Sequence, residues 1–163
     1  MKEISIPPAP WRLNGQAVAF LASPLTLRLL VNYDSSPVGS YLEHALAIPT
    51  WLGPRVIEMS VNSEASKIGG REIWGYPKTL ENLSWQRDGA HLIFRRSNQT
   101  FRLRICGPSF PLVLPFWTVQ TLNGENVRVP ARMKARTKLA FRGRQIAIFV
   151  ESFEMIFEPP QLL

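Results

Sequence analysis

Apolar residues occur along this chain in short runs that prolines and glycines interrupt. In residues 100–105 (TFRLRI) apolar and polar positions alternate, which is the period of a half-buried β-strand. Asp88-Gly89 lies between two such runs and predicts a β-hairpin. Fourteen prolines and ten glycines leave few uninterrupted helical windows, so the pattern predicts a mainly β chain. Further strands are expected at residues 17–22, 25–31, 39–48, 55–61 and 145–150.

One segment has a helical start signal. Asn62 or Ser63 is a suitable N-cap, and a short helix is expected over residues 64–73, weakened by Gly69 and Gly70. Many short strands separated by turn signals favour an antiparallel barrel or sandwich. A chain of 163 residues predicts a single domain over residues 1–163.

Composition narrows the class of protein. The single cysteine, Cys106, excludes an internal disulfide, and two dispersed histidines, His44 and His91, do not suggest a metal site. The N-terminal residues contain no apolar signal-peptide core, and no apolar run is long enough to cross a membrane. We therefore expect a cytoplasmic protein that does not engage a membrane.

The net charge of +7 comes entirely from the second half of the chain. Seven basic residues lie between positions 128 and 144 with no acidic residue among them: Arg128, Arg132, Lys134, Arg136, Lys138, Arg142 and Arg144. Such a run can attract nucleic acid. Phe141 is the only aromatic residue within it, which is sparse for base stacking, so a solvated strand face is the favoured interpretation.

The residues with the clearest chemistry lie in positions 69–80 (GGREIWGYPKTL). Lys78 follows Tyr76-Pro77, where the proline ring fixes the local backbone. Trp74, Tyr76 and Leu80 are expected to shield Lys78 from water, which would lower the pKa of its amine. A neutral lysine amine attacks carbonyl carbons and forms Schiff bases. The alternative from composition alone is an ordinary surface lysine after a turn.

This segment resembles the signature of the acetoacetate decarboxylase family, which runs Gly-Arg-Glu and then aromatic-Pro-Lys. The resemblance assigns the Schiff-base lysine to Lys78 and matches Gly70, Arg71, Glu72, Tyr76 and Pro77. A second stretch, residues 39–49, is similar to the family's Gly-x-Tyr-x-Glu and Ala-Ile-Pro elements and assigns a pocket glutamate to Glu43. Together these likenesses extend over about residues 10–130.

The resemblance implies a closed, cone-like antiparallel β-barrel with the lysine inside and one or two short helices. It also implies a homo-oligomer and chemistry that needs no cofactor. Trp74 and Tyr76 are expected to contact the substrate, while Arg71 and Glu72 are expected to support the lysine loop structurally.

The chain departs from the family at three positions. Thr79 stands where these decarboxylases have a second lysine. In a gapless register, Gln16 and Arg28 stand where the family has a pocket arginine and a pocket glutamate. Arg28 lies inside an apolar run, an unusual place for an unpaired guanidinium, so it is a candidate for binding a substrate carboxylate. The alternative is a strand arginine that faces solvent or pairs with an acid.

The sequence therefore predicts a lyase that acts on a small keto acid through a Schiff base at Lys78, with Glu43 as its acid or base. Decarboxylation, aldol cleavage and dehydration all use the same intermediate. The first alternative is a non-catalytic barrel that binds a small carboxylate or apolar ligand. The second is a nucleic-acid-binding module built on the basic run.

Overall fold

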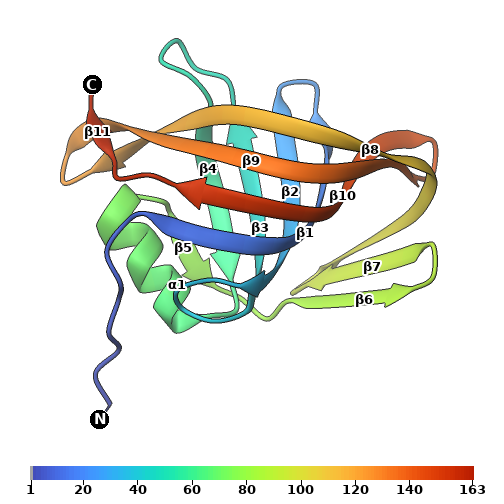
Figure 1. Cartoon of the computed structure of the whole chain (residues 1–163), viewed down its shortest axis with the longest axis horizontal. Helices are drawn as coiled ribbons and strands as arrows, with labels where there is room; N and C mark the ends of the chain where they lie inside the picture. Colours follow the sequence, from blue (N-terminus) through green and yellow to red (C-terminus); the bar gives the residue numbers. More distant parts are fainter. Residues whose placement is uncertain (1) are drawn as a thin grey trace.

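The computed structural model describes residues 2–163 and is mainly β (Figure 1). The short elements are α1 (Glu64–Gly69), a π-helical turn η1 (Gly70–Trp74), β5 (Lys78–Leu80) and β11 (Gln161–Leu162). The longer strands are β1 (Trp11–Ser23), β2 (Thr26–Ser35), β3 (Tyr41–Ile48), β4 (Arg55–Val61), β6 (Ser84–Asp88), β7 (His91–Arg96), β8 (Gln99–Leu122), β9 (Glu125–Arg142) and β10 (Gln145–Phe157).

Ten of these strands form one continuous sheet in the order β5-β4-β3-β2-β1-β10-β9-β8-β7-β6, and β11 pairs with β9. The long strands β8, β9 and β10 arch across the shorter strands β2, β3 and β4 (Figure 1). Val119 of β8 donates a backbone hydrogen bond to Pro54, the residue just before β4 (2.8 Å), and the side chain of Gln120 bonds both backbone groups of Val56. The strongly curved sheet thus meets itself and encloses a core.

The predicted β class and cone-like shape are confirmed, with two differences. Within residues 2–163 the end strands β5 and β6 do not pair with each other, so no ladder between the two end strands closes the sheet. In addition, β4 and β5 are parallel, because α1 and η1 form the crossover between them. A parallel pair requires such a crossover, whereas a hairpin gives an antiparallel pair.

The two faces of the sheet support two separate apolar clusters. Successive side chains of a strand point to opposite faces. Tyr41, Glu43 and Ala45 of β3 accordingly lie on the face that packs under α1, whereas Leu42 and His44 lie on the face covered by the β6–β7 hairpin. A bulge between Val150 and Ser152 shifts the alternation of side chains along β10, so this strand contributes buried residues to both clusters.

The predicted hairpin at Asp88-Gly89 is confirmed by the pairing of β6 with β7. Not every proline or glycine that interrupts an apolar run ends a strand, since Gly107, Pro108, Pro111 and Pro115 all lie within β8. Beyond residue 104, β8 pairs only with β9, which leaves its other edge free to accommodate prolines without losing ladder hydrogen bonds. A bulge between Cys106 and Phe110 absorbs the first of these irregularities.

The predicted helix is confirmed at its start. The Ser63 side chain accepts a hydrogen bond from the backbone of Ser66, as an N-cap does. The helix then changes at Gly70 into the wider π-helical turn, which ends at Gly75 with φ of 75°. In residues 2–163 there is no helix of the length and apolarity needed to traverse a bilayer.

The basic run forms most of β9, where exposed cations alternate with buried small residues such as Val129 and Ala131. This arrangement is the one expected of a solvated strand face.

Candidate active site

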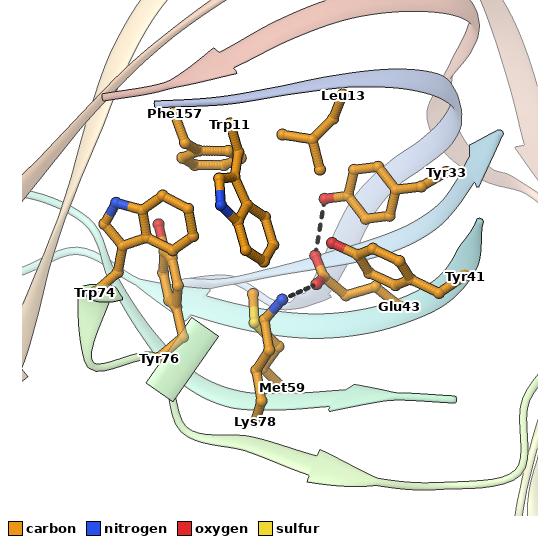
Figure 2. A pocket seen from close by; sticks show the side chains of 10 residues that line it. All are labelled: Trp11, Leu13, Tyr33, Tyr41, Glu43, Met59, Trp74, Tyr76, Lys78 and Phe157. Atoms are coloured by element: carbon orange, nitrogen blue, oxygen red, sulfur yellow. Dashed lines mark hydrogen bonds and ion pairs between the residues drawn. The ribbon is translucent and has the colours of Figure 1, made fainter. Parts of the chain in front are cut away.

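Lys78 begins β5 and points into the core (Figure 2), where it meets Ser66 of α1. Only 4% of its surface is exposed. Its Nζ lies 3.1 Å from Oε2 of Glu43 and donates a hydrogen bond to Oγ of Ser66 at 2.9 Å. The surface-lysine alternative is therefore wrong, because the ammonium group is enclosed and held by two partners.

The glycine at position 70 makes room for the lysine. A Cβ on Gly70 would lie 2.5 Å from both Cδ and Cε of Lys78, which is closer than atoms can pack. The π-helical turn that starts at Gly70 carries Arg71, whose Nε donates to the backbone carbonyl of Lys78 at 2.6 Å. Arg71 thus holds the strand that carries the lysine, as expected of a supporting residue. Glu72 in the same turn is exposed.

Glu43 of β3 is 4% exposed and contacts two partners at once. Oε2 faces Lys78, while Oε1 accepts a hydrogen bond from the hydroxyl of Tyr33 at 3.0 Å (Figure 2). Burial, followed by the nearby Glu43 carboxylate, raises the pKa of Tyr33, so its hydroxyl keeps its proton and remains a donor. The ring of Tyr41 lies beside the pair, 5.3 Å from Nζ of Lys78.

The charge state of Lys78 differs from the sequence-based expectation. Burial is the largest single influence and lowers the pKa of its amine, but the Glu43 carboxylate and the surrounding hydrogen bonds together outweigh burial, so the pKa is raised. The predicted fall in the pKa is therefore wrong for this arrangement. The sequence indicated the burial but not that a carboxylate would lie in contact with the amine. Lys78 rests as an ammonium ion and must lose a proton before it can attack a carbonyl group.

The wall of the pocket is mostly aromatic and leaves a cavity of about 20 Å³, roughly the room that one water molecule needs. Leu13 and Met59 are its aliphatic lining residues. The aromatic lining residues are Trp11, Tyr33, Tyr41, Trp74, Tyr76 and Phe157.

Trp74 and Tyr76 line this pocket, in the place expected for substrate contacts. Their polar atoms are engaged with the protein, because the indole of Trp74 donates to the carbonyl of Glu158 and the hydroxyl of Tyr76 bonds Thr118. They therefore present ring surface to the cavity. Leu80, predicted to shield the lysine, is 50% exposed and does not do so.

Gln16 and Arg28 lie outside this pocket. Gln16 adjoins a bulge between Gly15 and Ala17 and donates its side-chain amide to the carbonyl of Glu151 on β10. Arg28 pairs in register with Leu46 of β3, and its guanidinium lies 2.6 Å from Nε2 of His44. Since His44 and Glu43 are neighbours on one strand and face opposite ways, Arg28 and Lys78 are on different sides of the sheet. The structure thus does not place Arg28 where it would meet a substrate or Lys78.

Sequence reasoning missed three polar side chains around the Lys78–Glu43 pair, Ser66, Tyr33 and Tyr41. It also missed four apolar lining residues: Trp11, Leu13, Met59 and Phe157. Tyr41 was recoverable, because a residue two positions from Glu43 on a strand shares its face. Ser66 and Tyr33 come from α1 and β2, and only the tertiary fold brings them to Glu43 and Lys78.

Comparisons with known proteins bear on the family and the fold. A model of the family described as acetoacetate decarboxylase (ADC) matches residues 16–103. A search of curated proteins finds no match.

Two solved structures share the fold. A crystal structure of acetoacetate decarboxylase from Legionella pneumophila subsp. pneumophila str. Philadelphia 1 is 14% identical, with a TM-score of 0.66 over 96% of this chain and 88% of that one. A second structure of an acetoacetate decarboxylase is 12% identical, with a TM-score of 0.61 over 97% of this chain and 91% of that one. At such identities the likeness concerns the fold. The family model spans more than half of the chain and includes both Glu43 and Lys78, so this protein belongs to the acetoacetate decarboxylase family.

Proposed function

We propose that the protein is an enzyme that forms a Schiff base between Lys78 and a small carbonyl compound. The observation that carries the proposal is the position of the Lys78 amine, which is buried in an enclosed pocket and lies 3.1 Å from a single carboxylate. An amine and a proton acceptor in contact, shielded from water, are the groups that imine formation requires.

The proposed reaction begins with a proton transfer. The Lys78 ammonium gives one proton to Glu43, and the lone pair of the resulting amine attacks the carbonyl carbon. The π electrons of the carbonyl move to its oxygen, which takes a proton from the nitrogen, giving a carbinolamine. Glu43 then returns its proton to the hydroxyl group, water leaves, and the nitrogen keeps one proton in a positively charged imine. Glu43 is a carboxylate again at the end of the step.

Three residues prepare this exchange. The Tyr33 hydroxyl holds Oε1 of Glu43, which leaves Oε2 directed at the amine. Ser66 accepts from Nζ of Lys78 and orients the amine before attack. Gly70 provides the space that the lysine side chain occupies. No cofactor takes part in the proposed step.

Membership of the family suggests a carbon-carbon lyase and a small keto acid as substrate. In that case the protonated imine would accept the electron pair left when carbon dioxide departs. The same imine also supports removal of a Cα proton, which is the first step of aldolase and dehydratase chemistry.

Borohydride trapping tests the proposal. The protein would be incubated with acetoacetate, pyruvate, acetone or hydroxyacetone and then reduced, and its intact mass would be measured. We expect an adduct with at least one of these compounds in the wild type and in Lys67→Ala, and no adduct in Lys78→Ala. Lys67 is a suitable control because it lies on α1, near the pocket, but pairs with Glu64 at the surface. An adduct that persists in Lys78→Ala would contradict the proposal.

The alternative of a non-catalytic barrel has one observation in its favour. The contact with Glu43 raises the pKa of Lys78, and a permanent ion pair would leave the amine unreactive. In that case a small ligand would bind without a covalent adduct, and the same trapping experiment would give no mass increase. The homo-oligomer and the cytoplasmic location stay predictions, which sedimentation and cell fractionation would test.

A further inference from the structure

The pocket around Lys78 is electrically balanced. Among its lining residues only Lys78 and Glu43 carry a charge, and the two charges are opposite and in contact. The remaining lining side chains are aromatic or aliphatic. The polar atoms of Tyr33, Trp74 and Tyr76 already have protein partners. A second anion in this pocket would therefore have to compete with Glu43 for the single cation.

Three other positions could have supplied a partner for a substrate carboxylate, but their side chains do not line the pocket. Arg71 donates its Nε to the backbone carbonyl of Lys78. Arg28 lies against His44 on the opposite face of the sheet. Thr79, the residue after Lys78, is exposed rather than part of the pocket wall. None of these three side chains lines the pocket within the part of the chain that the structure describes, residues 2–163.

This charge balance distinguishes between possible substrates. The protonated imine carries one positive charge, and Glu43 compensates it. A neutral carbonyl compound preserves that balance, whereas a keto acid adds a carboxylate and leaves one uncompensated negative charge. The cavity of about 20 Å³ holds about one water molecule, and a bound substrate would displace the water that could solvate this charge. An uncompensated buried charge is among the most unfavourable arrangements in proteins.

We propose that the substrate of this pocket is a small neutral aldehyde or ketone rather than a keto acid. The inference rests on the proposed Schiff base at Lys78 and narrows its substrate class. With a neutral substrate the reaction that follows is proton removal. The Glu43 carboxylate takes a proton from Cα, the electrons of that C–H bond form a carbon-carbon double bond, and the π electrons of the imine move to nitrogen. The product is a neutral enamine, ready to add to a second carbonyl group.

Matched pairs of compounds test the inference. Each pair contains a keto acid and a neutral ketone in which a hydroxymethyl group replaces the carboxylate: pyruvate with hydroxyacetone, and acetoacetate with 4-hydroxybutan-2-one. The rate of cyanoborohydride-trapped adduct formation on the wild-type protein would be divided by the rate on a lysine in a short, unstructured peptide. We expect this normalised rate to favour the neutral member of each pair by about 100-fold, the scale of leaving a buried charge unpaired.

Glu43→Gln provides the matched variant. With a neutral side chain at position 43, the carboxylate of a keto acid becomes the only partner of the positively charged imine. The variant is expected to trap all compounds more slowly, but the preference for the neutral member should shrink by at least about tenfold or reverse, because the competing anion is gone. If this variant does not fold, the comparison within each pair on the wild type still decides the matter.

The outcomes separate the two proposals. Equal or faster normalised trapping of the keto acids by the wild type would overturn the neutral-substrate inference while leaving the Schiff base at Lys78 in place. If no compound of either kind gives an adduct that depends on Lys78, the proposed function fails, and the inference fails with it.

Discussion

The two faces of the central sheet each bury a titratable side chain, and they do so in different ways. On one face Lys78 meets one carboxylate, one hydroxyl and a set of aromatic rings. On the other face His44 lies between two arginines: Arg28 and Arg96 both approach its Nε2, at 2.6 and 3.2 Å. Neighbouring residues of one strand, Glu43 and His44, supply a partner to each cluster.

The charged cluster around His44 links separate parts of the fold. Arg96 of β7 forms ion pairs with Glu81 and with Glu58 of β4, so it ties the β6–β7 hairpin to the sheet. Arg28 also stacks on the ring of Phe101 of β8, 4.8 Å from its centroid. Here several charged groups from distant segments contact one another, although Nε of Arg28 and Nδ1 of His44 are buried without a hydrogen-bond partner, whereas the Lys78 pocket encloses one pair beside a cavity. The difference teaches that burial of a charged group alone does not single out a candidate site; the Lys78–Glu43 pair differs from the His44 cluster in the cavity that lies beside it.

Glu43→Gln should have the largest effect on the Lys78 face. Loss of the proton acceptor is expected to slow imine trapping by about 100-fold or more. Without the carboxylate, burial becomes the dominant influence and the pKa of Lys78 falls, so the pH profile of trapping should move to lower pH. Trapping rates between pH 6 and 11, measured by intact mass, would show both changes. A profile identical to that of the wild type would mean that Glu43 does not control the amine.

Gly70→Ala should disturb the same face through geometry alone. The added methyl group would overlap Cδ and Cε of Lys78, so the amine must move away from Glu43. A displacement of about 1 Å can cost about 100-fold in rate, and we expect a loss of that order in trapping. Lys67→Ala, on the same helical segment, is the control. Unchanged trapping in a folded Gly70→Ala protein would contradict the role given to this glycine.

His44→Gln should affect only the opposite face. Burial is the largest cause that lowers the pKa of His44 to about 4, and the two arginines add to it. Because His44 is neutral when folded but has an ordinary pKa when unfolded, its contribution to stability is complete above about pH 6.5 and is lost as the pH falls toward 4. The loss is on the order of 3 kcal/mol.

Urea unfolding of both proteins between pH 4 and 7 would test this prediction. Glutamine keeps a hydrogen-bond acceptor without titrating, so the variant should show a smaller decline in the free energy of unfolding over this range. Its imine trapping should remain that of the wild type. Parallel declines in the two proteins would show that His44 is not the group responsible.

Arg28→Ala should have the smallest effect on the chemistry. We expect trapping rates and their pH profile within about twofold of the wild type, and a loss of about 1–3 kcal/mol in the free energy of unfolding, because a hydrogen bond to buried His44 disappears. Kinetic trapping and urea denaturation on the same preparation would measure both. A large change in substrate affinity would instead indicate that Arg28 contacts the substrate.

Local patterns in the sequence predicted much of this comparison. Side chains alternate along any strand, so a strand over residues 39–48 implies that Glu43 and His44 lie on opposite faces, and the motif at residues 69–80 indicated which lysine is buried. The turn at Asp88-Gly89 and the N-cap at Ser63 follow from local backbone chemistry and were equally predictable.

The features that the sequence did not predict depend on pairing between distant strands. The face occupied by Arg28 depends on the β2–β3 register, in which Arg28 pairs with Leu46. The direction of Gln16 depends on a bulge after Gly15 that no local pattern indicated. The raised pKa of Lys78 depends on β3 and β5 lying on either side of β4, so that Glu43 and Lys78 meet. Each is a contact between distant segments, which period and composition do not specify.

The most direct test of the account is to locate the reduced adduct within the chain. The protein contains five lysines, at positions 2, 67, 78, 134 and 138, and after borohydride reduction with hydroxyacetone, proteolysis and tandem mass spectrometry would identify the modified one. The account predicts modification at Lys78 alone, and loss of that modification in Glu43→Gln under the same short reaction time. Modification spread over the exposed lysines with Lys78 untouched would contradict it.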